Sequence, residues 1–356
     1  MNQLGELFST SYLKPPHLCV EMSGNHQGKL ESALAFASKA KAVGADSLKV
    51  QVYKPETITI KSRMSDFRLS GDSDWASYKT LYDLYQKAHT PWEWVEALFK
   101  HAKDIELPIF ASPFDPTAVE FLENLDCQVY KIASPEITDL GLIDLCAQTR
   151  KPVIISTGLA SREDIDIVVE LLRERNSPFM ILKCVSAYPT PLEDMNVSTI
   201  PWLENLYQCP VGLSDHTLGK EAAFSASALG ARLIEKHFKL FGDAKSVDSK
   251  FSMPLENLSN FKKELHAVFF ATGSPTLDIP EIAKPSLSGR RSLYVVSKIK
   301  KGDLFTAKNV RSIRPSYGIP PKNIKKVLGR RATRDLEKGE RFSWDMVDGE
   351  ENGKEK

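Results

Sequence analysis

Residues 210–238, PVGLSDHTLGKEAAFSASALGARLIEKHF, determine the fold that we expect for this chain. Two short apolar runs flank a helical segment, and the runs end at His216 and near His237. A strand, a helix and a second strand in this order form a βαβ unit with parallel strands. Side chains two residues apart share a strand face, so Ser214 and Glu235 should accompany the two histidines. The pattern therefore predicts two imidazoles at one end of a sheet, as half of a metal site.

The same alternation of apolar runs and helical segments recurs over residues 17–272. Buried strands are expected at 17–22, 47–53, 108–114, 128–134, 152–158, 179–188, 210–216 and 230–238. Helices are expected at 29–45, 80–107, 116–125, 140–149, 161–176, 196–207, 220–229 and 258–272, with Thr90 as an N-cap before Pro91. Strand and helix units in this number predict an α/β fold of the (β/α)₈ TIM barrel type.

An open doubly wound sheet would use the same alternation of strands and helices. Such a sheet normally carries a glycine-rich phosphate loop after its first strand. The loop SGNHQG at residues 23–28 lacks the GxGxxG spacing of that loop. We therefore favour the closed barrel over the open sheet.

The part of the chain beyond the barrel has a different pattern. We assign residues 1–274 to the barrel and residues 275–289, which contain several prolines, to a linker. Residues 290–349 alternate apolar and polar side chains between two Lys-Gly turns, at 301–302 and 338–339, which predicts a small mostly β domain. Residues 350–356 are predicted to be a disordered tail.

The charge of the chain is unevenly distributed. Residues 290–341 contain 16 Lys and Arg against 4 Asp and Glu, whereas the whole chain has a net charge of only +1. A basic block of this kind could bind nucleic acid. It shows short strand patterns rather than a run of charges, so we favour docking on an acidic body or on an anionic substrate. We expect no nucleic acid partner.

Cysteine usage and hydropathy suggest where the protein works. The five cysteines show no CxxC spacing, which favours reduced thiols and a cytoplasmic location. The N-terminal residues MNQLGELFSTSYLKPP lack the apolar core of a signal peptide. No apolar run reaches the roughly 18 residues that a membrane-spanning helix needs, so we expect no membrane partner.

Polar side chains gather where the predicted strands end, which is where barrel enzymes carry their catalytic groups. These side chains are Glu21, Lys49, Gln51, Ser112, Lys131, Ser134, Glu136, Ser156, Lys183, Ser186, Tyr188, Ser214, His216, Glu235 and His237. Lysines at strand ends could extend to solvent without a function. Three of them, with interspersed hydroxyls, instead suit a phosphate or a carboxylate, which needs several converging donors.

Two alternatives follow from the same residues. Lys131 or Lys183 could form a Schiff base, as in lysine-dependent aldolases, but the histidine pair would then have no role. A barrel that only binds glycans or nucleic acid is a second alternative, and the gathering of lysines and histidines at one face argues against it. Ser156 lies in STG and lacks the GxSxG elbow of a serine nucleophile. A metal with an anionic co-substrate is the favoured chemistry.

Motifs along the chain match a known family. VEMSGNHQG, LKVQVY, FASPFD, YKIASPE, ISTGLA, LKCVSAYPTP, GLSDHTLG, IEKHF, VDSKFS and IRPSYGIPP, in this order, resemble the sialic acid synthase family. MSGNH, TLYDLYQKAHTPWEW, KCVSAYP and RRSLYVV resemble most closely its branch that makes pseudaminic acid. The resemblance covers residues 17–346.

The resemblance implies an activity and an architecture. Members carry a (β/α)₈ barrel and an antifreeze-like (SAF) domain in a domain-swapped homodimer. They condense phosphoenolpyruvate with an acetamido sugar and release phosphate by C–O cleavage, using a divalent metal that is usually Mn²⁺. For the pseudaminic branch the sugar is 2,4-diacetamido-2,4,6-trideoxy-L-altrose. Legionaminic or N-acetylneuraminic acid is the product in the alternative branches.

The resemblance also implies roles for residues of this sequence. His216 and His237 match the metal ligands. The positions that match the phosphoenolpyruvate-binding set are Lys49, Ser112, Lys131, Ser134 and Ser214. The positions that match those lining the sugar and its water are Glu21, Gln51, Glu136, Tyr188 and Asp248. Glu21 or Glu136 would handle the proton.

Two further positions complete the comparison with the family. Arg314 matches the arginine that the C-terminal domain inserts into the partner subunit's active site to bind an acetamido group. Ser186 stands where the sialic acid branch has an asparagine near the phosphate, and MSGNH replaces IGxNH. Both departures fit the pseudaminic branch.

Overall fold

The structure is a computed structural model that describes residues 4–9, 13–69, 75–242 and 244–349. The chain divides into two compact units, Met1–Gly273 and Ser274–Lys356, and each is described by itself. The predicted disordered tail, residues 350–356, lies outside the described residues.

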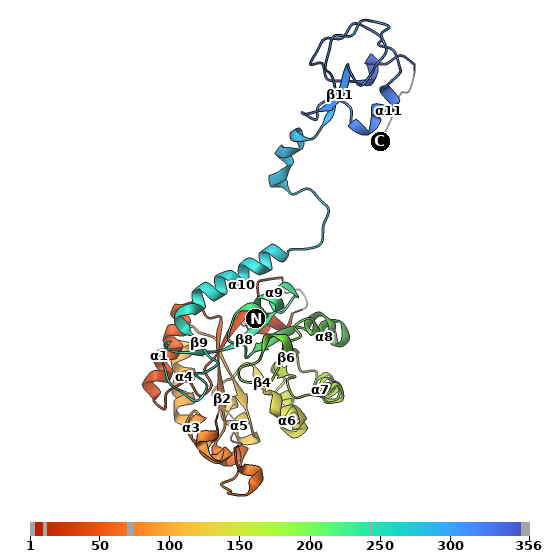
Figure 1. The fold of residues 1–356 in the computed structure, drawn as a ribbon. Helices are drawn as coiled ribbons and strands as arrows, with labels where there is room; N and C mark the ends of the chain where they lie inside the picture. The colour runs from red at the N-terminus through yellow and green to blue at the C-terminus, as the bar shows by residue number, and fades with distance from the viewer. Residues whose placement is uncertain (1–3, 10–12, 70–74, 243, 350–356) are drawn as a thin grey trace. The chain divides into compact units, whose positions relative to one another are not determined.

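The first unit is a closed barrel of parallel strands (Figure 1). The strands are β1 (His17–Glu21), β2 (Ser47–Val52), β3 (Ile109–Pro113), β4 (Tyr130–Ile132), β5 (Val153–Ser156), β6 (Phe179–Cys184), β7 (Val211–Asp215) and β8 (Leu233–Lys239). Each strand pairs in parallel with the next, and β8 pairs with β1, which closes the sheet. The predicted (β/α)₈ barrel is thereby confirmed.

A helix follows every barrel strand and covers its outer side (Figure 1). These helices are α1 (Leu30–Ala42), α4 (Trp92–Asp104), α5 (Pro116–Asn124), α6 (Leu140–Gln148), α7 (Arg162–Glu174), α8 (Thr199–Tyr207), α9 (Glu221–Ala228) and α10 (Leu258–Thr272). Additional short elements are α2 (Pro55–Ile58) and α3 (Leu81–Ala88), both between β2 and α4, and β9 (Met253–Pro254), which pairs with the end of β8.

The segment 80–107 forms two helices, α3 and α4, rather than one. Thr80 caps α3 by accepting a hydrogen bond from the Asp83 amide. The expected N-cap at Thr90 is wrong, because the cap position of α4 is Pro91, and no side chain caps that helix. A residue before proline is driven toward extended conformations, which separates the two helices at this point.

Two strands are shorter than the sequence predicts, and this places site residues on loops. β4 stops at Ile132 because a 3-10 turn follows over Ser134–Thr138, with a proline inside it. β6 stops at Cys184 rather than continuing to residue 188. Ser134, Glu136, Ser186 and Tyr188 therefore extend from βα loops and not from the strands themselves.

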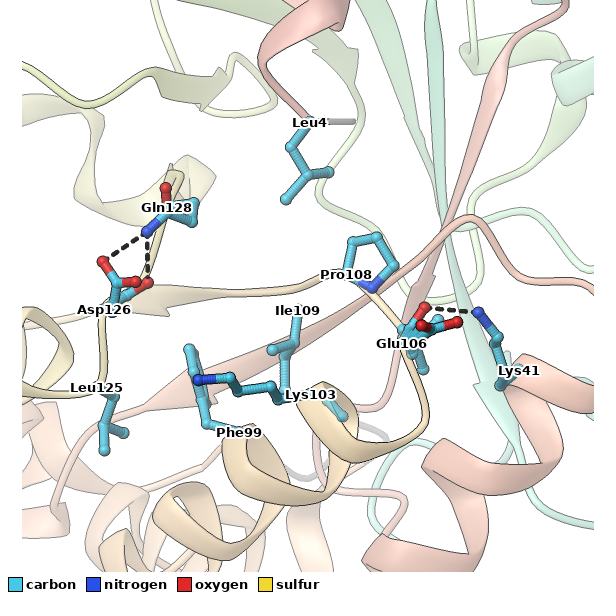
Figure 2. A pocket seen from close by; sticks show the side chains of 12 residues that line it. Leu4, Lys41, Phe99, Lys103, Glu106, Pro108, Ile109, Leu125, Asp126 and Gln128 are labelled. Carbon is cyan, nitrogen blue, oxygen red and sulfur yellow. Dashed lines mark hydrogen bonds between the residues drawn. The ribbon is translucent and has the colours of Figure 1, made fainter. Parts of the chain in front are cut away.

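The end of the barrel at which the strands begin carries a pocket of about 600 Å³. Figure 2 shows that Leu4, Lys103 and Ile109 line it, and it lies beside the amino-terminal ends of β3 and β4. Lys41 donates a hydrogen bond to the carbonyl of Glu106 at its edge. Catalytic groups of barrels lie at the carboxyl ends of the strands, so this pocket is separate from the site described below.

The second unit has a small core of its own. β10 (Ser292–Val295) and β11 (Val310–Ile313) form an antiparallel pair, and the short helix α11 is Ile324–Val327. The core contains Leu293, Phe305 and Phe342. Gly302 and Gly339 have φ values of +85° and +97°, the left-handed conformation that favours glycine in turns, so both Lys-Gly sequences do form turns. The predicted linker includes 3-10 turns over Glu281–Gly289.

Among the described residues, no helix has the length and apolarity to span a membrane.

Candidate active site

Four ionisable side chains form a buried cluster at the carboxyl ends of the strands, which we call the charged cluster. Glu21 ends β1, Lys49 lies in β2, Lys131 in β4 and Glu235 in β8. Lys49 Nζ is 2.6 Å from Glu21 Oε2 and 3.6 Å from Glu235 Oε1. Lys131 Nζ is 3.3 Å from the same Glu235 oxygen. None of the four side chains is more than 4% exposed, so the two amines balance two carboxylates in a dry setting.

Two hydroxyls extend this cluster. Lys49 Nζ donates to Ser112 Oγ on β3 at 3.3 Å, and Ser214 Oγ on β7 donates to Glu235 Oε1 at 3.2 Å. Gln51 follows Lys49 at the next position on the same face of β2 and is half-buried. The amines and hydroxyls together offer converging donors of the kind that bind a phosphate or a carboxylate.

The two carboxylates of the charged cluster differ in their protonation. Burial raises the pKa of Glu21 to about 7, with Lys49 opposing that shift and Glu235 adding to it. Burial also acts to raise the pKa of Glu235, but Lys131 and Lys49 outweigh it and lower the pKa. Glu235 is therefore the permanent anion, and Glu21 can gain or lose a proton near neutral pH.

The two histidines meet as the sequence predicts. Their ring centroids are 5.4 Å apart, and His216 Nδ1 donates to the carbonyl of Val185 at 2.8 Å. That bond fixes the ring and leaves Nε2 for a ligand. Burial acts to lower the pKa of His216, but Cys184 and the Val185 carbonyl outweigh it and raise the pKa, so Nε2 binds a metal only after it loses its proton. His237 Nδ1 is buried and has no hydrogen-bond partner among the described residues. Burial, with the charge of His216, holds the pKa of His237 well below its usual value, so its imidazole is neutral.

A neutral imidazole with an unpaired buried nitrogen is suited to a metal ion. Within the described ranges, no group of three or more His, Cys, Asp or Glu side chains is arranged to hold a metal. The pair therefore supplies two nitrogen donors, and any further ligands have to be water or substrate oxygens. The arrangement of the two histidines is compatible with the predicted half of a metal site.

Aromatic side chains surround the histidines. Tyr188 lies 4.4 Å from His216 between ring centroids, and Phe251 lies 5.0 Å from His237. Tyr188 and Phe251 are themselves 5.0 Å apart, and Trp75 lies 5.7 Å from Tyr188. One side of the histidine pair is therefore apolar.

The loop after β5 brings two of the predicted serines together. Ser134 Oγ accepts a hydrogen bond from the Leu159 amide at 2.7 Å. A Cβ atom at Gly158 would come within 3.0 Å of Ser134 Oγ and 2.9 Å of Cys184 Sγ, and closer still to Ser186 Oγ. A side chain at position 158 would have to displace these side-chain atoms, so the loop passes close to Ser134 and Ser186.

Two further carboxylates lie near the rim of the barrel. Glu136 is half-buried, its Oε2 has no partner within the described residues, and burial raises its pKa to about 7. Asp248 Oδ2 accepts a hydrogen bond from the Gly24 amide at 3.1 Å. Burial raises the pKa of Asp248 despite that bond. Glu136 and Glu21 are thus the candidates for proton transfer at neutral pH.

Lys183 does not join the other two lysines, and the prediction that three lysines converge is wrong. Its half-buried Nζ donates to the carbonyl of Cys184 at 3.0 Å. Cys184 Sγ, the next residue, lies 4.0 Å from His216 Nδ1. Neighbouring side chains on a strand point to opposite faces, so Cys184 faces the site and Lys183 faces away from it.

Three residues of the site had no individual role assigned from the sequence. Glu235 contacts both lysines of the charged cluster, and its sequence signal was its shared strand face with His237. Phe251 lies in the motif VDSKFS but had no role assigned to it, and Trp75 had no local signal. Arg314 belongs to the second unit, follows β11 and is exposed.

Comparisons with known proteins point to the same family as the sequence motifs. The sequence profile of the NeuB family matches residues 36–276, and that of the SAF domain matches residues 290–348. The pseudaminic acid synthase of Campylobacter jejuni is 42% identical over 92% of this chain and 95% of its own length. That of Helicobacter pylori is 38% identical over 94% of this chain and 99% of its own length. The crystal structure of an N-acetylneuraminic acid synthetase from Leptospira borgpetersenii, with citrate, matches with a TM-score of 0.68, at 28% identity, over 77% of this chain and 90% of that one.

Proposed function

Since this chain belongs to the NeuB family, we propose that it condenses phosphoenolpyruvate with 2,4-diacetamido-2,4,6-trideoxy-L-altrose to give pseudaminic acid and phosphate. The family resemblance inferred from the sequence is confirmed. The chain is a transferase of the class that condenses phosphoenolpyruvate with a sugar. The two pseudaminic acid synthases are 42% and 38% identical to it, against 28% for the sialic acid enzyme, which favours the pseudaminic product.

The charged cluster is the observation that carries the proposal, because it suits a small substrate with several negative charges. Lys49 and Lys131 would bind the carboxylate and phosphate of phosphoenolpyruvate. The hydroxyls that would complete this site are those of Ser112, Ser134, Ser186 and Ser214. Protonated Glu21 would remove one negative charge from the cluster as the anion enters, so the pKa of Glu21 near 7 is matched to the task.

The histidine pair would hold a divalent metal, for which we propose Mn²⁺. Such an ion, when bound, polarises the aldehyde of the open-chain sugar as a Lewis acid. His216 is oriented for this by Val185, and His237 is kept neutral by burial. Gln51, Tyr188 and Asp248 would line the sugar beside the histidines.

The bond changes require two proton transfers. C3 of phosphoenolpyruvate forms a bond to the aldehyde carbon, and the aldehyde oxygen takes up a proton. Water then adds at C2 and loses one proton; the C2 hydroxyl becomes the ketone as the C–O bond to phosphate breaks, and its proton leaves with the phosphate. Glu21 and Glu136, both with a pKa of about 7, are suited to hold and deliver these protons. Unchanged turnover in Glu21→Gln would remove Glu21 from this role.

We also propose a domain-swapped homodimer in which Arg314 binds an acetamido group in the partner's site. Arg314 is exposed, and no side chain among the described residues pairs with it. A guanidinium in this state is available to a ligand. Mixed dimers of Arg314→Ala and His237→Ala chains should regain activity, and mixtures that stay inactive would contradict insertion from the partner.

The five buried cysteines, none of which forms a disulfide, support our proposal of a cytoplasmic location.

Phosphate release from phosphoenolpyruvate tests the function directly. The protein is assayed with Mn²⁺ and either the diacetamido-altrose sugar or N-acetylmannosamine, with and without EDTA. We expect release with the altrose sugar alone and its loss in EDTA. Release with N-acetylmannosamine alone would move the product to the sialic acid branch, and no release with either would contradict the proposal. Mn²⁺ binding followed by electron paramagnetic resonance, in wild type and His216→Ala, reports on the metal independently of turnover.

A further inference from the structure

Three aromatic side chains from separate loops meet above the histidine pair. Trp75 comes from the long insertion between β2 and α4, Tyr188 from the loop after β6, and Phe251 from the loop after β8. Their ring centroids are 5.7 Å apart for Trp75 and Tyr188, 6.5 Å for Trp75 and Phe251, and 5.0 Å for Tyr188 and Phe251. These contacts form one continuous surface, which we call the aromatic wall.

The aromatic wall is held in place. The Trp75 indole Nε1–H donates to the carbonyl of Val247 at 3.2 Å, which ties the insertion after β2 to the loop after β8. Phe251 is only 4% exposed, and Tyr188 and Trp75 are half-buried. Because rotamers locked by packing and hydrogen bonds lose little entropy on binding, such a wall is suited to select a ligand by shape.

The wall lies where the far end of a sugar would extend. The charged cluster is built on the strands, the histidines stand at the strand ends, and the wall comes from the loops beyond them. With phosphoenolpyruvate on the charged cluster and the aldehyde at the histidines, the rest of the sugar continues toward the loops. The contacts of Tyr188 with His216 and of Phe251 with His237 make the wall the next surface that it meets.

The wall is short of hydrogen-bonding groups. Phe251 has no polar atom, and the indole N–H of Trp75 is engaged by Val247. The Tyr188 hydroxyl is the remaining polar group of these three side chains. An apolar substituent therefore fits here better than a hydroxyl, which would be desolvated without a full set of partners.

We propose that Trp75 and Phe251 are specificity-determining residues which, with Tyr188, bind the C6 methyl group of the sugar and select a 6-deoxy sugar over its 6-hydroxy counterpart. The inference rests on the proposed function and assigns a role to two residues, Trp75 and Phe251, that had none from the sequence. An apolar pocket discriminates against an added hydroxyl by about 100-fold at most, which sets the expected scale.

The test compares two sugars that differ only at C6, 2,4-diacetamido-2,4,6-trideoxy-L-altrose and its 6-hydroxy analogue. For wild type we expect kcat/KM to favour the 6-deoxy sugar by about 10-fold to 100-fold. Trp75→Ala and Phe251→Ala should raise the KM for the 6-deoxy sugar and reduce that preference toward unity. The KM for phosphoenolpyruvate should stay within about twofold, because the wall contacts described above are with the histidines and the Val247 carbonyl. Trp75→Phe, which keeps an aromatic ring, should retain most of the preference.

Trp202→Ala is the matched control, since Trp202 lies on α8 with 51% of its surface exposed. It should leave both the KM values and the preference unchanged. Equal preference for the 6-deoxy sugar in Trp75→Ala, Phe251→Ala and wild type would overturn the inference while leaving the proposed function intact. A wild type that uses neither altrose sugar would instead contradict the proposed function.

Discussion

The charged cluster and the histidine pair lie in one site but differ in whether their polar groups are paired with other groups of the protein. In the charged cluster each ion faces an ion of opposite sign, with Lys49 and Lys131 both directed at Glu235. In the histidine pair, His237 Nδ1 is buried without a partner among the described residues. The ions of the first region are already paired with one another, although Glu21 and Glu235 keep carboxylate oxygens without a hydrogen bond among the described residues, whereas the unpartnered nitrogen of the second region faces no opposite charge.

Because of this difference, substitutions in the two regions should affect the stability of the fold and the turnover to different extents. Removing one member of a buried ion pair leaves an uncompensated charge and destabilises the fold. Removing the buried imidazole of His237 loses packing contacts but no hydrogen bond of Nδ1, so it should cost less folding free energy than breaking a buried ion pair. Substitutions in the charged cluster should therefore reduce both stability and turnover, whereas substitution of His237 should mainly reduce turnover.

The largest expected effect on turnover comes from His237→Ala. Loss of one of two protein nitrogen donors should lower turnover by at least about 100-fold, since even outer-shell changes at metal sites cost 10-fold to 100-fold. The melting temperature in EDTA should stay close to that of wild type. Steady-state kinetics and thermal unfolding are measured together, with His101→Ala on α4 as the control histidine. A large drop in melting temperature would contradict the contrast between the two regions.

Glu235→Gln should have the largest effect on stability. It leaves Lys131 without its carboxylate and Lys49 with only Glu21, which should lower the free energy of unfolding by about 3 kcal/mol. The pKa of Glu21 should also fall below about 7, because Glu235 contributes to raising it. Denaturant unfolding measures the first effect, and the pH profile of kcat/KM follows the second.

Glu204→Gln provides the control for that experiment. Glu204 pairs with Arg232 at 3.4 Å, but its side chain is 41% exposed. Exposed pairs contribute about 1 kcal/mol or less, so this substitution should barely alter unfolding. Equal decreases in the free energy of unfolding for Glu235→Gln and Glu204→Gln would mean that burial does not determine how much the charged cluster stabilises the fold.

Glu136→Gln should change stability in a pH-dependent way. The folded state raises the pKa of Glu136 to about 7 from an ordinary value of 4.5, so it favours the neutral acid. That contribution is fully present below pH 4.5 and is lost as the pH rises through 7. A glutamine stays neutral, so the variant should melt a few degrees higher than wild type at pH 8 and close to it at pH 5. A difference that is the same at both pH values would contradict this.

The smallest effect is expected from Lys183→Met. Lys183 donates to the Cys184 carbonyl and lies apart from the charged cluster, so turnover should stay within about twofold of wild type. Lys131→Met in parallel should lose most activity and stability. Inactivity of Lys183→Met would restore the Schiff-base alternative for that lysine.

The sequence by itself determined the features that depend on short-range periodicity. Eight repeats of strand and helix predicted the barrel, and the two-residue period placed Ser214 with His216 and Glu235 with His237. The same period placed Gln51 with Lys49. Strand ends of a barrel converge by geometry, so the approximate composition of the site also followed from the chain order.

Only the tertiary structure decided which groups touch. Glu235 meets Lys131 across 104 residues because β8 returns to β1 and closes the barrel. β6 reads FMILKC, a nearly continuous apolar run buried on both faces, so no alternation in the sequence revealed that Lys183 faces away. The aromatic wall combines loops that are far apart in the chain, with Trp75 and Val247 separated by 172 residues. Such contacts are set by how loops pack on the closed barrel, and local periodicity carries no information about them.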